Sequence, residues 1–555
     1  MSSPREKTQE PTESAVRAAV SRVREAIAPR VFYPSALIIL AFILVGTLWQ
    51  TETPADGETK ETDFSVVLDR VNTWITEKLG WYYILVVFAF VVFTLVVGLS
   101  RFGGIRLGPD DSKPEFSRMS WFAMLFSAGM GIGLVFWGAA EPLAHYATPP
   151  YAEPETEQAA RDAMHASFMH WGVHAWAIYV VVGLALAYAV HRKGRPLSLR
   201  WALEPLLGRH VRGWLGDLID VTAVVSTLFG VATSLGLGAQ QVNAGLDYLG
   251  LVSTPESSTQ TNFAQIAIIA VITSIALWSV LTGVKKGIKW LSNINIVAAA
   301  VLLTSVFIVG PTLFELRELF TTVGYYLQNI LRTSLDAGAY PAEQSGYPEE
   351  GGFQAAWTAF YWGWWISWAP FVGVFIARIS KGRTVREFCL GVLLVPTAIS
   401  FVWFAFMGGT ALHQAMEGAD ILGLDEASAL FAMLDGLPAS QLLAGLATLL
   451  VVTFFVTSSD SGSLVIDTLA SGGNLEPPKP TRAFWALAEG AVAITLLVVG
   501  GIAALQTVSI VTALPFSIIM IGICAATWKA LSKEHRALSR GSKRRREKAN
   551  VSAES

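Results

Sequence analysis

Two stretches of this chain are rich in aromatic side chains that could bind a cation. The first places three rings within about 140° of arc if the segment is helical, at Trp171, Trp176 and Tyr179. The second is a stripe of rings at steps of three residues, at Trp362, Trp365, Trp368 and Phe371. A quaternary ammonium has no hydrogen-bond donors and is attracted to each aromatic face by roughly 0.5–2 kcal/mol. The pattern therefore indicates an aromatic cage for such a cation.

Tryptophan also marks the headgroup belts of membrane proteins, and this alternative would explain roughly half of the 19 tryptophans in the chain. Trp176 and Trp365 lie about a turn or more inside their apolar segments, where a belt explains them less well. We therefore expect these two residues in the cage.

Three glycines at alternate positions, Gly129, Gly131 and Gly133, interrupt the apolar segment 119–140. Each glycine inside a helix costs roughly 0.5–1 kcal/mol relative to alanine, so the helix is expected to unwind here. Unwound backbone at membrane depth is tolerated where it faces protein or a water-filled cavity, and it can then offer amides and carbonyls to a ligand. The alternative is that these small residues let two helices pack closely.

A cluster of hydroxyl side chains ends the apolar segment 438–459, at Thr457, Ser458, Ser459, Ser461 and Ser463. Hydroxyl and carbonyl oxygens are the ligands that hard cations prefer. The alternative is that these hydroxyls bond to carbonyls of their own or neighbouring helices. Asp460 and Asp467 are costly so close to lipid, and we expect them to be paired.

The sequence gives little support for a metal site, a disulfide framework, catalysis or nucleic-acid binding. We assign neither His145 nor His174 as a metal ligand, on the reading that each lacks a second histidine or a carboxylate at metal spacing. Cys389 and Cys524 lie in apolar stretches, which argues against a disulfide framework. The absence of a Walker motif, an HExxH motif and a nucleophile elbow predicts that the protein is not an enzyme, and no nucleic-acid footprint is visible. We expect no cofactor other than a coupling ion.

The composition requires lipid around the chain. Of its 555 residues, 53% are hydrophobic and 15% are charged, which is too few polar side chains to coat a soluble globule of this size. A spanning helix needs about 20 mainly apolar residues. Twelve windows qualify, at 31–50, 81–100, 119–140, 168–190, 217–249, 263–284, 289–311, 354–377, 387–410, 438–459, 482–503 and 508–530.

Basic residues orient these spans. With a cytoplasmic amino terminus, all but six of the 40 lysines and arginines fall inside, and the six outside are Lys60, Arg70, Lys78, Arg161, Arg317 and Arg332. We therefore predict a multi-pass protein of the cytoplasmic (inner) membrane with both termini in the cytoplasm. Its tails would be residues 1–30 and the basic residues 531–555, and segment 312–353 would form a periplasmic amphipathic helix and loop.

The spacing of the unusual segments suggests internal symmetry. The glycine-interrupted third span and the aromatic eighth span are five spans apart. If spans 3–7 and spans 8–12 are two copies of one unit, corresponding spans cross the membrane in opposite directions, because five is an odd number. We predict an all-α membrane protein with twelve transmembrane helices in a transporter domain at 31–530. Two extra N-terminal helices would precede a five-plus-five inverted repeat, with halves at 118–311 and 354–530.

From about residue 30 to residue 530 the chain resembles the betaine/choline/carnitine transporter family. Two regions carry the resemblance: Gly129–Gly133 with Phe136-Trp137-Gly138 and Glu141-Pro142-Leu143, and Trp362–Arg386 with Ala377-Arg378-Ile379-Ser380-Lys381-Gly382-Arg383-Thr384. The resemblance implies a fold of the sodium-symporter type, alternating access, a small zwitterionic substrate and usually a homotrimer.

The resemblance also implies roles for individual residues. The cage would consist of Trp171, Trp176, Tyr179 and Trp365, with Trp364 and Trp368 lining the path beside it. The carboxylate end of the substrate would face Met130, Gly131, Ile132, Gly133 and Ser234. A sodium site would use Ser127, Met130, Phe454, Thr457 and Ser458. A second sodium site would use Thr227 and Phe371, but Val231 stands where betaine carriers have another threonine.

Choline carriers of this family have an aspartate at the position of Gly133, so glycine favours a zwitterion. Exchangers that work without sodium replace the ion ligands, whereas Thr457 and Ser458 retain hydroxyls. We expect a sodium symporter that imports a quaternary-ammonium compatible solute, glycine betaine above others, during osmotic stress. The alternatives are another zwitterion (ectoine, proline or carnitine), proton coupling or exchange, and, from a different class, an ion channel or an osmosensor.

Overall fold

The chain is described by a computed structural model over residues 21, 24–49, 64–129, 131–252, 263–282, 285–340, 347 and 352–554, with side chains left out at 126–129, 285–289 and 541–554. Over these ranges the protein is helical, and its one β-type pairing is an isolated bridge between Arg106 and Thr384. The all-α fold class predicted from the sequence is therefore confirmed for the described part of the chain.

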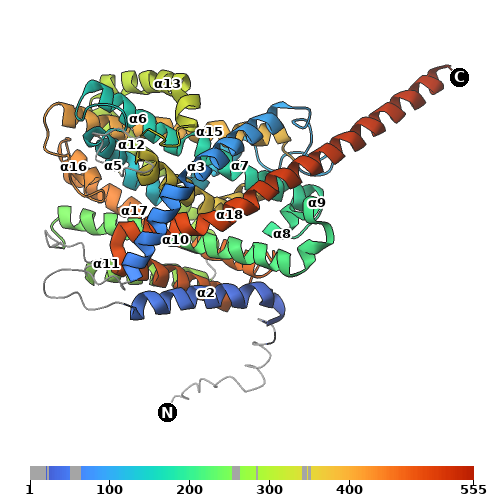
Figure 1. Cartoon of the computed structure of the whole chain (residues 1–555), viewed down its shortest axis with the longest axis horizontal. Coiled ribbons are helices and arrows are strands. Elements are labelled where there is room, and N and C mark those ends of the chain that lie inside the picture. Colours follow the sequence, from blue (N-terminus) through green and yellow to red (C-terminus); the bar gives the residue numbers. More distant parts are fainter. Residues whose placement is uncertain are drawn as a thin grey trace, which may run out of the picture.

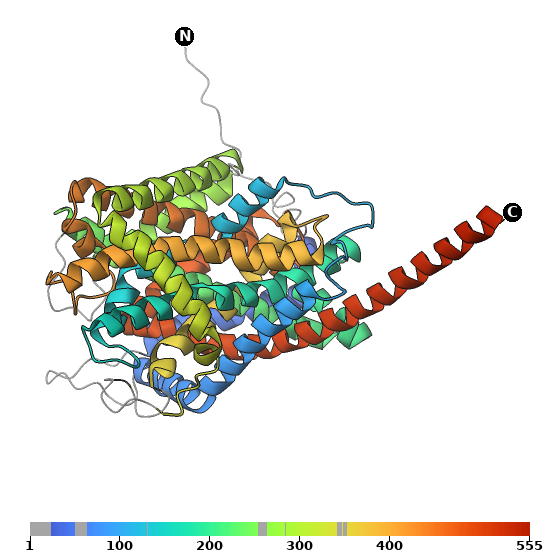
Figure 2. The ribbon, with the colours of Figure 1, turned by 90° about the horizontal axis from the view of Figure 1, so that it is seen from above.

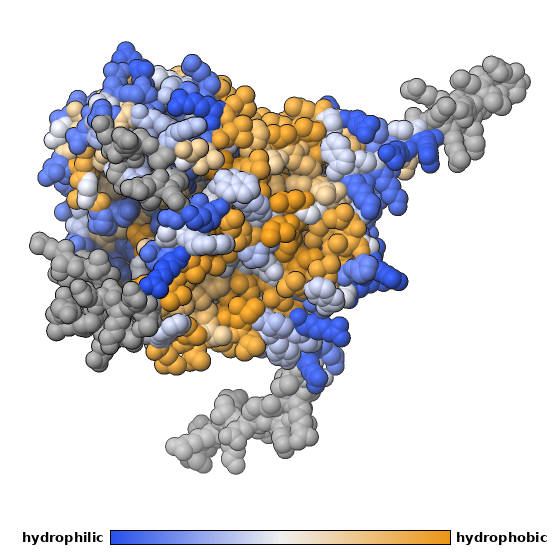
Figure 3. All heavy atoms as spheres, viewed as in Figure 1, coloured by the Kyte–Doolittle hydropathy of each residue, from blue (hydrophilic) through white to orange (hydrophobic). Residues whose placement is uncertain are grey.

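Nine helices in the described ranges are long and apolar enough to cross a membrane. They are α2 (Pro29–Leu48), α3 (Phe64–Leu99), the run Glu157–Arg192, α10 (Trp214–Tyr248), α11 (Phe263–Thr282), Trp290–Val309 within α12 (Lys285–Val309), α15 (Val385–Met416), α17 (Ser440–Ala470), and Lys479–Arg540 within α18 (Lys479–Glu554). In a space-filling view, a broad hydrophobic surface covers the middle of the molecule and hydrophilic residues gather toward its two ends (Figure 3).

Three features explain why these nine helices differ from the twelve predicted windows. The window 119–140 is divided between two shorter helices, α4 (Arg118–Gly129) and α5 (Ile132–Ala147). The window 354–377 corresponds to a π-helical turn, Gln354–Thr358, followed by α14 (Ala359–Ile379), which is long enough to cross a membrane but is made less apolar by its tryptophans. The last two windows lie in α18, whose backbone is non-helical at Gly500 and Gly501. The number of membrane crossings and the inverted repeat stay predictions.

The helices that carry the candidate site pack against one another (Figures 1 and 2). The run Glu157–Arg192 consists of α6 (Glu157–Trp171), α7 (Val173–Ala187) and a π-helical turn, Tyr188–Arg192. Helix α7 packs along α14, while α10 contacts α14, α17 and α18, and α5 lies against α6 and α15. The aromatic segments of α6, α7 and α14, far apart in the sequence, are thereby brought together.

Helix α13 (Thr312–Ser334) lies where the sequence predicts an amphipathic helix, at the edge of the helical body (Figure 1). It packs on α6 and α15. The Glu315 carboxylate of α13 is fully buried there, and its Oε1 accepts a hydrogen bond of 2.7 Å from the hydroxyl of Thr410. The predicted side of the membrane is not tested, and most of the predicted loop after α13 lies outside the described residues.

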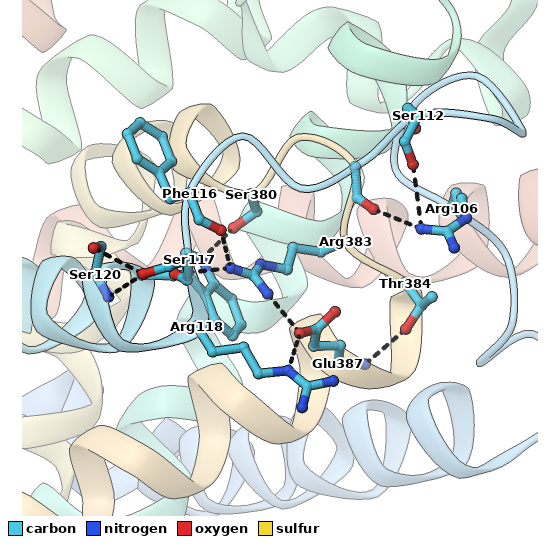
Figure 4. Close-up of polar contacts among 12 residues, drawn as sticks. Arg106, Ser112, Phe116, Ser117, Arg118, Ser120, Ser380, Arg383, Thr384 and Glu387 are labelled. Atoms are coloured by element: carbon cyan, nitrogen blue, oxygen red, sulfur yellow. Dashed lines mark hydrogen bonds and ion pairs between the residues drawn. The ribbon is translucent and has the colours of Figure 1, made fainter.

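The segment between α14 and α15 is tied to the start of α4 by a buried arginine (Figure 4). The guanidinium of Arg383 donates to the carbonyl oxygens of Phe116 (2.7 Å) and Ser117 (3.1 Å) and to the carboxylate of Glu387 (2.5 Å). It also lies 4.6 Å above the ring of Trp121, at the start of α4. Because one planar cation joins all these groups, the helix that enters the glycine-rich segment and the helix that carries the aromatic stripe are fixed to each other at one end.

The carboxyl-terminal segment is described almost to its end, whereas most of the amino-terminal tail is not. Residues 1–20 of the predicted N-terminal tail lie outside the described residues. Helix α18 continues to Glu554 and extends away from the helical body (Figure 2). The predicted basic tail at 531–555 is therefore helical as far as it is described, and its place in the cytoplasm stays a prediction.

Candidate functional site

The helix break predicted at the alternating glycines is confirmed. Helix α4 ends at Gly129, α5 begins at Ile132, and Gly131 between them is extended, with φ −148° and ψ −158°. A Cβ atom added to Gly131 would lie 3.8 Å from the Trp368 ring. Met130 and the side chain of Ser127, both predicted to bind sodium, lie outside the described residues.

The four residues predicted to form the cage are buried and close together. The ring centroid of Trp365 lies 4.8 Å from that of Trp171 and 6.4 Å from that of Tyr179, and Tyr179 lies 5.4 Å from Trp176. The interplanar angles of these pairs are 73°, 75° and 81°. Because neighbouring rings are nearly perpendicular, the faces of more than one ring can contact the same cation.

Trp364 packs against the cage by stacking on Trp365. Its ring stacks on Trp365 with centroids 4.6 Å apart and an interplanar angle of 14°. A Cβ atom added to Gly133 would lie 2.5 Å from Trp364 Cη2 and 3.1 Å from Trp171 Cη2, and a Cβ atom does not fit at 2.5 Å from a ring carbon. Gly133 therefore lets the interrupted helix approach the cage. Whether Trp364 also lines a path for the substrate stays a prediction.

Beside the cage, a cavity of about 110 Å³ brings the other predicted elements together. Its wall includes Gly131 from the helix break, Trp368 and Phe371 from α14, and Thr457 and Ser458 from α17. The predicted hydroxyl cluster thus shares one cavity with the helix break and the end of the aromatic stripe. Such a cavity is large enough to hold an ion and a few waters.

The hydroxyl of Thr457 shows that the alternative interpretation of the cluster also applies. It donates to the carbonyl oxygens of Thr453 (3.0 Å) and Phe454 (3.1 Å), and it accepts from the amide of Asn295 (3.1 Å). This hydroxyl is therefore bonded within its own helix, and Thr457 also lines the cavity. Asp460 is paired as expected, with its carboxylate 2.8 Å from the guanidinium of Arg482.

The remaining predicted residues lie in the same bundle. In α10, the hydroxyls of Thr227 and Ser234 bond to their own helix, donating to Ala223 (2.7 Å) and Gly230 (3.3 Å). Both side chains are buried. Neither contact tests whether Thr227 and Phe371 share an ion or whether Ser234 reaches a substrate.

The premise that His145 lacks a nearby carboxylate and a second histidine was wrong. The structure brings three ligand-type side chains, Glu141, His145 and His170, within 4.8 Å of one another, and all three are buried. Glu141 Oε1 lies 3.3 Å from His145 Nε2 and 2.7 Å from His170 Nδ1. A signal was present, because Glu141 and His145 are four residues apart on one helix and so lie on the same face. His170 comes from another helix, and its part was visible only in the fold.

Comparison with known proteins identifies a family. The sequence profile of the betaine/carnitine/choline family transporters matches residues 30–536. An uncharacterized transporter of Mycobacterium tuberculosis is 50% identical over 522 residues, covering 92% of this chain and 84% of the relative. The glycine betaine transporter OpuD of Bacillus subtilis is 43% identical over 508 residues (91% and 96%). A glycine betaine/proline/choline transporter of Vibrio parahaemolyticus is 41% identical over 485 residues (84% and 85%).

Proposed function

Because this chain belongs to the betaine/carnitine/choline family of transporters, we propose that it imports glycine betaine by sodium symport. It is a membrane transporter and not an enzyme. In our proposal the protein lies in the cytoplasmic membrane, with both termini in the cytoplasm, and crosses the membrane twelve times, with two inverted repeats among these helices. It works by alternating access during osmotic stress. It assembles as a homotrimer.

The observation that carries the choice of substrate is the closely packed group of Trp171, Trp176, Tyr179 and Trp365. A trimethylammonium group cannot donate hydrogen bonds, and stacked or perpendicular aromatic faces attract it by roughly 0.5–2 kcal/mol each. Three of these rings come from the first predicted half and one from the second. A substrate held between them would therefore respond to movement of one half against the other.

The carboxylate end of the substrate would lie toward the helix break. Helix α5 begins at Ile132, and the first amides of a helix have no partner in their own helix and attract negative charge. Gly133 adds no carboxylate of its own to repel the substrate. This arrangement favours a zwitterion over choline, and relatives named as glycine betaine transporters support the same choice.

Sodium coupling is proposed from the hydroxyls of α17. Thr457 and Ser458 line the cavity that Gly131 also lines, and hard cations prefer hydroxyl ligands of the kind they carry. Val231 is buried in α10 and offers no oxygen. We therefore propose one sodium site at this cavity.

Uptake of radiolabelled glycine betaine into proteoliposomes tests the function and its coupling. With an inward sodium gradient we expect accumulation, and with a proton gradient alone we expect none. Accumulation driven by a proton gradient would indicate proton coupling in place of sodium symport. Uptake only into proteoliposomes preloaded with betaine would indicate exchange. Ionic currents far above a carrier's turnover would contradict transport and support a channel.

The second candidate is a broader substrate range. One relative is named a glycine betaine/proline/choline transporter, and an aromatic cage can accept different compounds that carry the same trimethylammonium group. Competition by unlabelled proline, ectoine, carnitine and choline against labelled betaine would measure this range. We expect carnitine to compete better than proline, because carnitine has three methyl groups on its nitrogen.

A further inference from the structure

A single carboxylate joins several residues around the cage. Glu141, in α5, is fully buried. Its Oε2 accepts hydrogen bonds from Trp171 Nε1 (2.7 Å) and from the hydroxyl of Tyr361 (2.5 Å). Its Oε1 lies 2.7 Å from His170 Nδ1 and 3.3 Å from His145 Nε2. Four donors, one from α5 itself and three from α6 and α14, thus surround one carboxylate, and one of them is a cage residue.

The same group reaches a second cage residue through the backbone. Trp365 Nε1 donates to the carbonyl oxygen of His170 at 2.8 Å. This carbonyl is available because α6 ends at Trp171, and the last four carbonyls of a helix have no partner within it. Gly172 separates α6 from α7. A glycine is needed at this helix end because a Cβ atom there would lie 2.4 Å from the carbonyl oxygen of Phe168.

The imidazole of His170 is held on both sides. Its Nε2 lies 3.1 Å from the hydroxyl of Thr358, while its ring stacks on Tyr361 with centroids 4.4 Å apart at an angle of 22°. An indole has only one donor, so bonding that donor fixes the rotation of the ring about its side-chain torsions. Hydrogen bonds to a buried carboxylate are short and strong, and removing the acceptor leaves the donors unsatisfied.

We propose that Glu141 is a positioning residue for the substrate. It orients the Trp171 indole directly and the Trp365 indole through His170, so that both rings keep the angle at which they surround a quaternary ammonium. This inference rests on the proposed function, because the effect of positioning is read as betaine affinity. Glu141 itself accepts the Trp171 N–H, whereas the Trp365 N–H is bonded to the backbone of His170.

A metal ion is the competing interpretation of the same cluster. The ligand atoms of Glu141, His145 and His170 lie within 4.8 Å of one another. However, both carboxylate oxygens already accept from protein donors, Oε1 from the two histidines and Oε2 from Trp171 and Tyr361. A metal bound by these atoms would have to replace at least two of these hydrogen bonds. We therefore favour positioning.

The test compares Glu141→Gln with the wild type in purified full-length protein. Glutamine keeps the shape but places an NH₂ group where an acceptor is needed. We expect the apparent betaine dissociation constant to rise about tenfold, with a smaller change in maximal uptake rate. We also expect the tryptophan emission and near-UV circular dichroism of the ligand-free protein to change. Glu315→Gln, a buried carboxylate on α13 away from the cage, is the matched control and should change none of these readouts.

Two milder variants keep the test valid if Glu141→Gln folds poorly. Tyr361→Phe removes one donor and retains the ring, and Trp171→Phe removes the indole N–H. If Glu141 acts through Trp171, the effects of Glu141→Gln and Trp171→Phe on betaine affinity are not additive, and the double variant is little worse than the single ones. Additive effects would overturn the proposal.

Three further results are decisive. Unchanged affinity and unchanged tryptophan spectra in Glu141→Gln would overturn positioning. A stoichiometric metal in the wild type that is lost in Glu141→Gln, together with loss of uptake on chelation, would overturn it in favour of a metal site. If the wild type binds no betaine, the proposed function fails, while a spectral change in Glu141→Gln would still support orientation of the indoles by this carboxylate.

Discussion

Gly133 lies where the interrupted helix meets the cage, and its missing side chain is a structural requirement. A Cβ atom at this position would overlap the Trp364 ring at 2.5 Å and press on Trp171 at 3.1 Å. Both rings are buried and rigid, so they cannot yield without disturbing Trp365, on which Trp364 stacks. The glycine thus affects the cage through packing as well as through charge.

We predict that Gly133→Ala weakens glycine betaine binding. Overpacking typically costs about 1–3 kcal/mol, and part of this cost should appear as a higher apparent substrate constant because the displaced rings form the cage. Gly324→Ala, on α13, is the control, since a Cβ atom there meets nothing within 4 Å. An unchanged constant in Gly133→Ala would mean that these rings do not contribute to binding.

Thr457 supports a separate prediction about the ion. Thr457→Ala removes a hydroxyl from the cavity wall, and we expect the sodium concentration for half-maximal uptake to rise strongly while thermal stability changes little. Thr453→Ala is the matched control, because Thr453 makes equivalent bonds to its own helix, to the carbonyls of Leu449 and Leu450. Equal effects of the two substitutions would show that Thr457 only stabilises the helix.

At the residue scale, the sequence was informative about the rings and less so about what holds them. Aromatic spacing indicated a cage that includes Trp176 and Trp365, and the family resemblance implied all four of its residues. The spacing assumed one continuous helix, whereas the break at Gly172 places Trp171 on α6 and Trp176 and Tyr179 on α7. The role of Glu141 could not be predicted, because its partners His170, Trp171 and Tyr361 come from two other helices. Only the fold brings these donors to one carboxylate.

At the scale of elements, α13 carries a titratable contact. Burial against α15 raises the pKa of Glu315 to about 7, and the hydrogen bond from Thr410 only partly opposes this effect. Glu315 Oε2 is buried without a hydrogen-bond partner, which adds to the cost of the charged form. The contact between the amphipathic helix and the bundle is therefore expected to respond to pH.

The sign of this response follows from the raised pKa. Between the ordinary pKa of 4.5 and about 7, the folded protein binds more protons than the unfolded chain, so the free energy of unfolding falls as the pH rises. We expect the thermal stability of the wild type to fall across this window relative to Glu315→Gln, by at most about 3 kcal/mol. Parallel pH profiles of the two proteins would contradict the assignment.

The two helix breaks show what sequence patterns can and cannot reveal. Three glycines in five residues predicted the break between Gly129 and Ile132, because each weakens a helix locally. The break at Gly172 was not predicted. A single glycine is common in apolar helices, and the reason for this one is its close approach to the Phe168 carbonyl, which is visible only in the fold.

At the scale of the whole molecule, the candidate site combines segments that are distant in sequence. The cage draws on α6, α7 and α14, and the neighbouring cavity adds the helix break and α17. Hydropathy windows predicted where apolar helices occur, and the last two correspond to the two parts of α18 on either side of the non-helical Gly500 and Gly501. The windows did not predict that 119–140 would be divided between α4 and α5. Windows record composition, whereas helix limits depend on backbone geometry at particular glycines.

In the proposed site a methylated nitrogen is held against indole faces, and one binding series tests this most directly. Affinities of the purified protein for glycine betaine, dimethylglycine, sarcosine and glycine should fall with each methyl group lost. In Trp365→Leu, betaine affinity should drop by about 5- to 30-fold, equivalent to roughly 1–2 kcal/mol, and the series should flatten. Trp278→Leu, an exposed tryptophan on α11, should leave the series unchanged. If glycine binds the wild type as tightly as glycine betaine, or if Trp365→Leu retains the full methylation dependence, the cage is not the substrate site.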